Sequence, residues 1–395
     1  MSEGRLIPEL RFPEFEIEGE WEENELNHFC CSISSGKDKL SEEGVFPLYG
    51  STGIIGKTDN ISYSGDYILV ARVGANAGFL NRAKGNFGVT DNTLVLDFKN
   101  ADKIDFLFFL LAKIDLNKLV FGSGQPLITG SQLKSLKIIS PKSEKEQEKI
   151  ASCLSSLDEV ISAHTQKLEL LKNHKKGLMQ NLFPQEGEKV PKWRFKEFEG
   201  DGEWEVKKLG NVAENIMYGM NAAAIEYDGI NKYIRITDID EHTRKFEPNP
   251  VTSPQGKLED KYLLRKGDLL FARTGASVGK SYIHLIQDEN IYFAGFLIRF
   301  SIVHADPYFI YIQTLTDPYR KWVLKTSMRS GQPGINAEEY KSFEIALPPS
   351  PQEQNRIAKC ILSLDEIITG QTYKIEQLKL HKQGLMQGLF PRIES

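Results

Sequence analysis

A glycine-rich turn in the second half of the chain has residue types that could bind phosphate. The stretch Gly275–Ser281 reads GASVGKS and follows the apolar run Leu269–Phe271. A phosphate-binding P-loop needs Gly-x4-Gly-Lys-Ser/Thr, because its backbone N–H groups must wrap around the phosphates. Only three residues separate Gly275 from Gly279, and the related stretch Arg72–Phe79 (RVGANAGF) has no lysine. A glycine turn shared by both stretches explains them better, so a nucleotide-dependent enzyme is the weakest of three hypotheses.

No other stretch carries a motif for catalysis or metal binding. Cys30 and Cys31 are adjacent, Cys153 and Cys360 occupy equivalent places in two repeats, and no CxxC is present. The seven histidines do not fall with serines or carboxylates at the spacing of a nuclease, hydrolase or metal site. An adenine methyltransferase would need an Asn/Asp-Pro-Pro-aromatic turn, and the nearest stretch, Glu247–Pro250 (EPNP), does not match it. We therefore expect no catalytic residue and no metal ligand in this chain.

Polar loops and strand-end arginines are better candidates for DNA binding. The tetrapeptide Ser-Gly-Gln-Pro occurs at Ser123–Pro126 and again at Ser330–Pro333. A fixed turn explains the Gly and Pro; in the functional alternative, the Ser and Gln side chains and nearby N–H groups face DNA. Arg72 and Arg273 follow strands at equivalent places. An arginine there can read a guanine edge, although it can equally pair with a carboxylate.

A cluster of basic residues precedes the second of these loops. No acidic residue lies between Asp317 and Glu338, and Tyr311, Tyr319 and Trp322 are interleaved with the basic ones. Such a cluster suits contacts with phosphates, and a solvated helix face is the alternative. The first repeat has a thinner version. The predicted DNA-binding residues are Arg72, Lys113, Lys118, Ser123, Gln125, Arg273, Arg320, Lys321, Lys325, Arg329, Ser330 and Gln332.

Two long helices are expected to position these residues. Glu144–Pro184 and Pro351–Pro391 align without a gap at a shift of 207 positions, and their apolar residues recur in two series of period seven. This spacing predicts a long helix with a narrow apolar seam, about 50–60 Å long at 1.5 Å per residue. The seam of one helix is the obvious partner for the other. The predicted packing residues are Ile150, Leu154, Leu157, Ile161, Leu168, Leu171, Leu178, Leu182, Ile357, Ile361, Leu364, Ile368, Ile375, Leu378, Leu385 and Leu389. Polar breaks in the seam also match, His164 with Gln371 and Lys175 with Lys382.

The whole chain reads as a tandem repeat. The opening Leu10–Phe15 has a twin at Trp193–Phe198, shifted by 183, so the second copy is 24 residues longer, mostly around Tyr227–Leu258. Between opening and long helix, short alternating runs with glycine turns predict mainly β domains, each with a helix, at Asp105–Leu119 and Tyr308–Leu324. We predict an α+β fold with a first recognition domain at 1–140, a helix at 141–184, a linker at 185–192, a second domain at 193–347 and a second helix at 348–395.

Composition is ordinary for a folded, non-membrane protein. The chain has 395 residues, 40% apolar and 26% charged, and a net charge of −5. Residues 1–29 carry nine acidic and two basic side chains, which leaves the remaining 366 residues at +2. A nearly neutral body with basic patches is compatible with DNA binding. No apolar run is long enough to span a membrane and no secretion signal is visible, so we expect a cytoplasmic protein.

Several motifs resemble those of one family, the specificity subunits of type I restriction–modification enzymes. The motifs are EQNRIA at Glu353–Ala358 with Leu364-Asp365, EQEKIA at Glu146–Ala151 with Leu157-Asp158, the closing Gly-Leu-Met-Gln-x-Leu-Phe-Pro of both copies, and PLYGSTGIIG at Pro47–Gly56. The similarity extends over nearly the whole chain.

This resemblance implies two target-recognition domains, each followed by a spacer helix, with the helices packed as an antiparallel coiled coil of pseudo-twofold symmetry. It implies a non-catalytic subunit that binds a bipartite, asymmetric site in double-stranded DNA. It also implies that two methyltransferase subunits and the restriction/translocase subunits assemble on the chain. S-adenosylmethionine, ATP and Mg²⁺ would belong to those partners, with no cofactor in this chain. A structural adaptor that binds protein or sugar partners through two domains is the alternative.

Overall fold

The computed structural model describes residues 6–120, 127–287, 289–328 and 332–391. The chain divides into two compact units, of which unit 1 comprises Met1–Lys167 with Gln371–Ser395 and unit 2 comprises Leu168–Gly370. The long helices α3 (Glu144–Asn181) and α7 (Pro351–Leu389) therefore contribute one part to each unit. The predicted pair of long helices is confirmed.

Unit 1 is built on a six-stranded sheet with the strand order β2-β7-β5-β6-β3-β4. The strands are β2 (Cys30–Ser35), β3 (Phe46–Gly50), β4 (Gly53–Thr58), β5 (Tyr63–Ala71), β6 (Leu80–Val89) and β7 (Thr93–Phe98). Only β3 and β6 pair in parallel among these neighbours. A separate antiparallel pair, β1 (Glu22–Glu25) with β8 (Lys137–Ser140), precedes α3. Two short helices complete the unit, α1 (Ile104–Lys113) and α2 (Gly130–Lys134).

Unit 2 has the related strand order β10-β17-β14-β15, with smaller two-stranded sheets around it. The strands are β9 (Glu205–Lys208), β10 (Ala213–Tyr218), β11 (Ala224–Glu226), β12 (Asn231–Ile234), β13 (Thr252–Pro254), β14 (Asp268–Ala272), β15 (Ser281–Ile283), β16 (Asn290–Phe293), β17 (Leu297–Ile302) and β18 (Glu344–Leu347). The pairs are β11 with β13, β12 with β16, and β9 with β18. The stretch of extra residues in the second copy, around Tyr227–Leu258, thus contains β12 and β13. The helices are α4 (Pro307–Gln313), α5 (Asp317–Ser327) and α6 (Ala337–Lys341).

The two short helices predicted in the globular parts are shorter than the sequence pattern indicated. The stretch Asp105–Leu119 is helical only as far as Lys113, because Asp115 leaves the helical conformation and its carboxylate caps a 3₁₀ turn at Leu116–Leu119. The stretch Tyr308–Leu324 contains two helices, α4 and α5, because Pro318 has no N–H to continue α4 and instead starts α5.

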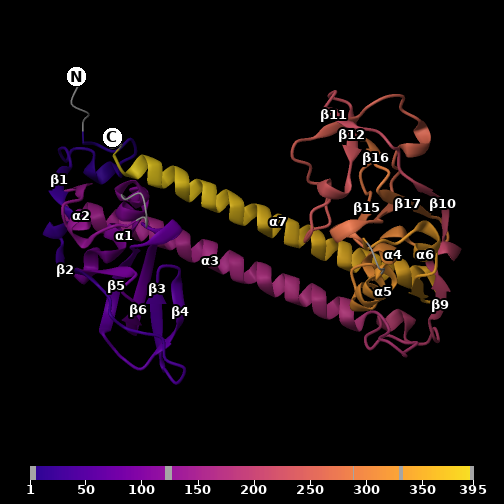
Figure 1. Cartoon of the computed structure of the whole chain (residues 1–395), viewed down its shortest axis with the longest axis horizontal. Coiled ribbons are helices and arrows are strands. Elements are labelled where there is room, and N and C mark those ends of the chain that lie inside the picture. Colours follow the sequence, from indigo (N-terminus) through magenta and orange to yellow (C-terminus); the bar gives the residue numbers. More distant parts are fainter. Residues whose placement is uncertain (1–5, 121–126, 288, 329–331, 392–395) are drawn as a thin grey trace. The chain divides into compact units, whose positions relative to one another are not determined.

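Within each unit, parts of α3 and α7 run side by side in opposite directions (Figure 1). The polar breaks in the seam pair with one another. In unit 1, Lys382 Nζ lies 2.6 Å from the Asp158 carboxylate, and Gln371 Nε2 lies 2.8 Å from both Nδ1 and the carbonyl oxygen of His164. In unit 2, Lys175 Nζ lies 2.6 Å from Asp365 Oδ1. A wrong register would separate these pairs, so the breaks help to specify the alignment of the two helices.

All sixteen predicted seam residues are buried or half-buried. Those with the least exposure are Ile150, Leu154, Leu168, Leu182, Ile357, Ile361, Leu364, Ile375 and Leu389. The half-buried ones are Leu157, Ile161, Leu171, Leu178, Ile368, Leu378 and Leu385. The ends of the seam merge with the domain cores, since Leu389 joins the core of unit 1 and Leu182 that of unit 2.

The repeated opening segment fixes the long helices to the globular part of each unit. In unit 1, Arg11 forms a bidentate ion pair with the buried Glu146 of α3, with both N–O distances at 2.8 Å. In unit 2, Arg194 binds Glu353 of α7 in the same way, at 2.9 and 2.7 Å. Trp21 packs edge-on against Phe390, in the same way that Trp204 packs against Phe183. The duplicated opening therefore has a structural explanation that the sequence did not provide.

Candidate nucleic-acid interface

The two predicted strand-end arginines occupy the same place in related sheets. Arg72 follows β5 and its Nη1 donates to the carbonyl oxygen of Asp91, at 3.4 Å. Arg273 follows β14 and its Nε donates to the carbonyl oxygen of Gly295, at 3.1 Å. In the two sheets Ala71 pairs with Thr93 and Ala272 pairs with Leu297. Asp91 and Gly295 each lie two positions before the paired residue, so their carbonyl groups are equivalent. Both side chains are therefore tied to a backbone carbonyl of the neighbouring turn.

A glycine turn and the residues just before a short helix lie beside each arginine. Gly74 and Gly275 open 3₁₀ turns with φ of 74° and 69°, values that favour glycine. A later segment of the chain lies beside each arginine and bonds to its backbone. Ile128 N donates to Arg72 O at 2.8 Å, and Ile335 N donates to Arg273 O at 2.9 Å. Ile128 before α2 and Ile335 before α6 thus lie next to the strand ends in the two units.

The predicted loop residues can be placed only in part. Gln332 is exposed, and its Nε2 lies 3.3 Å from the position that a Cβ would take on Gly275, so this amide lies next to the glycine turn. Ser123, Gln125, Arg329 and Ser330 lie outside the described residues.

The predicted basic cluster lies largely on α5 and is partly neutralised. Arg320, Lys321 and Lys325 are all exposed. Arg320 forms an ion pair with Asp317 at 2.8 Å, and Lys321 with Glu186 at 3.4 Å. Exposed pairs of this kind are weak, so the cations remain accessible to a stronger partner such as a phosphate. In unit 1, Lys113 is half-buried at the end of α1 and Lys118 is exposed in the turn that follows.

The aromatic residues interleaved with this cluster belong to the core of unit 2. Tyr311 and Tyr319 are buried, and Trp322 is half-buried and stacks on Tyr319. Burial raises the pKa of Tyr319 well above its ordinary value, and its hydroxyl donates to the carbonyl oxygen of Gly279 at 2.9 Å. Tyr319 therefore supports the glycine turn, and the buried rings of Tyr311 and Tyr319 are not available to stack on bases.

Two exposed aromatic residues that the sequence analysis did not single out flank Arg273. The Arg273 guanidinium lies 5.0 Å from the ring centroid of Tyr218 and 5.7 Å from that of Phe296. The two residues are 40% and 56% exposed. Tyr218 ends the edge strand β10, and Phe296 lies in the turn before β17, so only the sheet topology brings them together. No local sequence pattern could have indicated this cluster.

The lysine of the P-loop-like stretch is built into the fold. Lys280 is 7% exposed, and its ammonium donates to the carbonyl oxygen of Ile239 at 3.0 Å and pairs with Glu241 at 2.7 Å. The hydrogen bond from Lys280 lowers the pKa of Glu241. This lysine therefore ties the inserted segment of unit 2 to the glycine turn and is not presented to a nucleotide.

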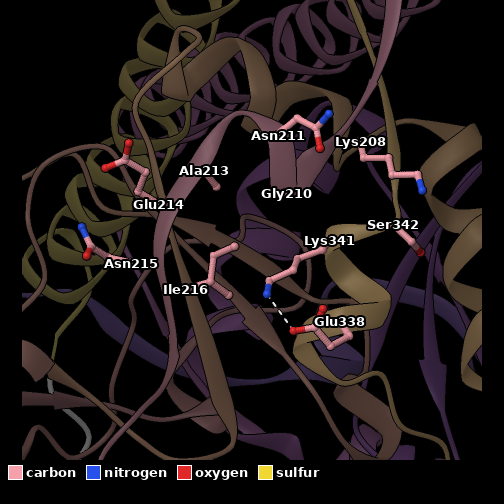
Figure 2. A pocket seen from close by; sticks show the side chains of 10 residues that line it. All are labelled: Lys208, Gly210, Asn211, Ala213, Glu214, Asn215, Ile216, Glu338, Lys341 and Ser342. Carbon is pink, nitrogen blue, oxygen red and sulfur yellow. Dashed lines mark hydrogen bonds and ion pairs between the residues drawn. The ribbon is translucent and has the colours of Figure 1, made fainter.

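A surface hollow on unit 2 includes none of the predicted DNA-binding residues in its lining. It has a volume of about 540 Å³ and is lined by residues of β10, α6, the end of β9 and the turn between β9 and β10 (Figure 2). Lys341 and Glu338 pair with each other on α6 at 2.7 Å, and Lys208 and Glu214 add one charge of each sign. This mixed, open lining has no set of groups suited to catalysis. Among the described residues no group of three or more His, Cys, Asp or Glu side chains could hold a metal ion, and no helix is long and apolar enough to cross a membrane.

Comparisons with known proteins agree on one family. The family described as "Type I restriction modification DNA specificity domain" matches residues 18–173 and again 201–380. The specificity subunit of the type I restriction enzyme MjaVIII from Methanocaldococcus jannaschii is 26% identical over 411 residues, which cover 95% of this chain and 92% of that protein. The specificity subunit of type I restriction enzyme EcoprrI from Escherichia coli is 30% identical over 129 residues, covering 33% and 32%.

A solved structure shares the fold over the whole length. The S subunit of a type I restriction–modification system from M. genitalium superposes with a TM-score of 0.69 and 16% identity, covering 98% of this chain and 100% of the other. The duplicated domain, the paired long helices and the two sequence matches lead to one conclusion: the chain belongs to the family of type I restriction–modification DNA specificity subunits.

Proposed function

We propose that this chain is the non-catalytic subunit that selects the DNA sequence for a type I restriction–modification complex. Residues 1–140 would bind one half of a bipartite, asymmetric site in double-stranded DNA, and residues 193–347 the other half. The observation that carries this proposal is that the DNA specificity domain occurs twice in one chain, at 18–173 and 201–380. Two different half-sites need two similar but diverged binding units on one frame.

The surroundings of the two arginines support a different reading by each unit. Arg72 and Arg273 have equivalent backbones, but their neighbours differ, with Asn92 at the place of Phe296. Exposed cations near these turns, Lys118 in unit 1 and those of α5 in unit 2, suit contacts with phosphates. A bipartite, asymmetric site requires two units that share a backbone arrangement but differ in the side chains around the arginine.

We further propose that the long helices bind two methyltransferase subunits and that the restriction/translocase subunits join through them. Val160 and Ile367 are equivalent residues of α3 and α7 that remain 43% and 51% exposed. An apolar side chain at the same place in each unit suits two copies of one partner. One structure that shares the fold, at a TM-score of 0.53, comes from work on complex assembly of the type I R-M system.

The cofactors of the complex would belong to its other subunits. S-adenosylmethionine would bind to the methyltransferase subunits, and ATP and Mg²⁺ to the restriction/translocase subunits. The buried state of Lys280 supports this division, since the one P-loop-like stretch holds its lysine within the fold. We propose that the complex acts in the cytoplasm, where the host DNA is.

Co-expression with a type I methyltransferase from the same genome tests the proposal. Sequencing of methylated host DNA should give one motif of two short parts separated by a gap of fixed length. Val160→Asp and Ile367→Asp should each reduce the number of bound methyltransferase copies from two to one in native mass spectrometry, with Glu159→Asp as the control on a neighbouring exposed position. Binding of a protein partner with no DNA binding, insensitive to salt, would favour the structural adaptor instead.

A further inference from the structure

The cluster of Arg273, Tyr218 and Phe296 supports a more specific role for unit 2. We propose that Arg273, whose guanidinium lies over both rings, reads the major-groove edge of one guanine in the half-site bound by unit 2. This inference rests on the proposed function, since it names the base that one part of the interface recognises.

The guanidinium of Arg273 is fixed before any DNA arrives. Its Nε donates to the carbonyl oxygen of Gly295 at 3.1 Å, and the Tyr218 and Phe296 rings lie on it at 5.0 and 5.7 Å. The Tyr218 ring is itself held, because its hydroxyl accepts a hydrogen bond from Ala337 N at 3.2 Å. An arginine restrained in this way loses little rotamer entropy on binding, which favours a contact that depends on direction.

The free edge of this guanidinium has the geometry of a guanine contact. Nη1 and Nη2 have no partner within the described part of the chain, whereas Nε is occupied. Two parallel N–H donors match the O6 and N7 acceptors of guanine. Adenine presents an N6 donor in place of O6, so an arginine held rigidly there would face a donor with a donor. The site therefore favours guanine over adenine by geometry.

The described residues of unit 1 do not form this arrangement, which predicts that the guanine requirement is confined to one half-site. Pairing of Ser35 with Leu94 and of Tyr218 with Ile298 places Ser35 where unit 2 has Tyr218. Asn92 replaces Phe296. Nη1 of Arg72 donates a hydrogen bond to the carbonyl oxygen of Asp91, and its Nε is buried without a partner among the described residues. Among the described residues, Arg72 is therefore not stacked on a ring, and its guanidinium is not presented in the same way as that of Arg273.

The test uses the complex of the full chain with its methyltransferase and begins with the wild-type motif. We expect one position in one half-site to require guanine. In Arg273→Met, the preference for guanine over adenine there should fall about 10- to 100-fold, because methionine has no donor for O6 or N7. Phe296→Leu and Tyr218→Phe should reduce it by less. Recognition of the other half-site should not change, which shows that the variants are folded.

A chemically modified duplex separates base reading from a phosphate contact. Replacing that guanine by 7-deazaguanine removes N7 and leaves the base pair intact. The wild-type complex should bind this duplex about tenfold more weakly, and Arg273→Met should not distinguish the two duplexes. Arg320→Ala serves as the matched control on α5, and it should weaken binding to all sequences and reduce the salt dependence.

The outcomes distinguish this inference from the proposed function. If the wild-type complex shows no sequence preference at all, the proposed function is wrong. If the wild-type motif is found but Arg273→Met keeps it, or if 7-deazaguanine has no effect at any position, the guanine assignment is wrong and the proposed function stands. Uniform weakening by Arg273→Met on all sequences would also overturn the assignment, since it would make Arg273 a phosphate contact.

Discussion

The buried ion pair between Arg194 and Glu353 allows a quantitative prediction about what holds α7 to unit 2. The two side chains are 6% and 1% exposed and joined by two hydrogen bonds of 2.9 and 2.7 Å. The hydrogen bonds to Glu353 raise the pKa of Arg194. In Arg194→Met the carboxylate would remain in a site without water, and removing one partner of a buried pair costs about 3–5 kcal/mol.

The same magnitude follows from proton binding. The variant can avoid a buried charge by protonating Glu353. A glutamate in water titrates near pH 4.3, and each pH unit corresponds to about 1.4 kcal/mol, so keeping such a group neutral costs about 4 kcal/mol at pH 7 and about 1 kcal/mol at pH 5. The destabilisation by Arg194→Met should therefore shrink by about 3 kcal/mol between these two pH values. Arg194→Met with Glu353→Met removes both charges and should restore most of the stability.

Unit 1 provides a matched control in the same molecule. Arg11 and Glu146 form the equivalent pair, 7% and 1% exposed, but Trp21 Nε1 also donates to Glu146, at 3.3 Å. In unit 2 the equivalent nitrogen of Trp204 is buried with no partner among the described residues. Arg11→Met leaves Glu146 with one donor, so we expect it to cost about 1 kcal/mol less than Arg194→Met.

Hydrogen exchange followed by mass spectrometry is the appropriate assay, because it reports on each unit separately. Protection should fall in unit 2 for Arg194→Met and in unit 1 for Arg11→Met. The reasoning fails if the double variant is as unstable as the single one, since the unpaired charge is then not the cause. It also fails if the loss of protection is the same at pH 5 as at pH 7.

Three further tests concern single side chains. Lys382→Met removes the partner of Asp158 from the seam of unit 1. Because both residues are partly exposed, urea unfolding should show that the free energy of unfolding falls by only about 0.5–1 kcal/mol. A loss several times larger would mean that the pair is shielded from water. Lys280→Met should lower the thermal midpoint of unit 2 because it removes the buried ammonium that bonds to the carbonyl oxygen of Ile239 and to Glu241. Calorimetric titration of the chain with ATP should show no binding before or after the change; ATP binding that disappears in the variant would mean that Lys280 belongs to a nucleotide site. Burial lowers the pKa of His284, so the unfolded chain binds more protons than the folded one, and stability should fall as the pH drops below about 6.5. His284→Gln should make the thermal midpoint less dependent on pH in this range. If the pH dependence of the midpoint does not change, other groups cause it.

The long helices could be predicted because their signal is local and repeated. The two heptad series and their polar breaks follow from residue spacing alone, and the structure pairs the breaks Lys175 and Lys382 with Asp365 and Asp158. The partners themselves were not predictable, since each pair joins residues 190 or more positions apart. The same limit applies to Arg11, whose partner is 135 positions away. Spacing thus identifies elements, and contacts of charged side chains across elements require the fold.

The candidate interface was predictable only in its basic residues. Arg273 was identified because it follows a strand in both copies, but Tyr218 and Phe296 come from two other strands and meet it only through the order β10-β17-β14. The aromatic residues interleaved with the basic cluster, such as Tyr319, looked suitable for stacking and are buried. Residue type therefore indicates which chemistry is possible, whereas exposure, which depends on packing, determines which side chains can perform it.

The contrast between the two units shows how a duplicated frame can acquire two specificities. The features that fix the strand-end arginine are backbone features: a left-handed glycine after the strand, a carbonyl oxygen in the next turn and a returning loop that hydrogen-bonds to the arginine. None of them depends on the neighbouring side chains. Positions 92 and 296, or 35 and 218, can therefore change without disturbing the turn, and the change alters only what surrounds the guanidinium. Asn92→Phe together with Ser35→Tyr should therefore add a guanine preference to the half-site of unit 1, and the methylated motif would reveal it. Complete loss of recognition of that half-site would mean that these side chains cannot change without disturbing the backbone of the turn.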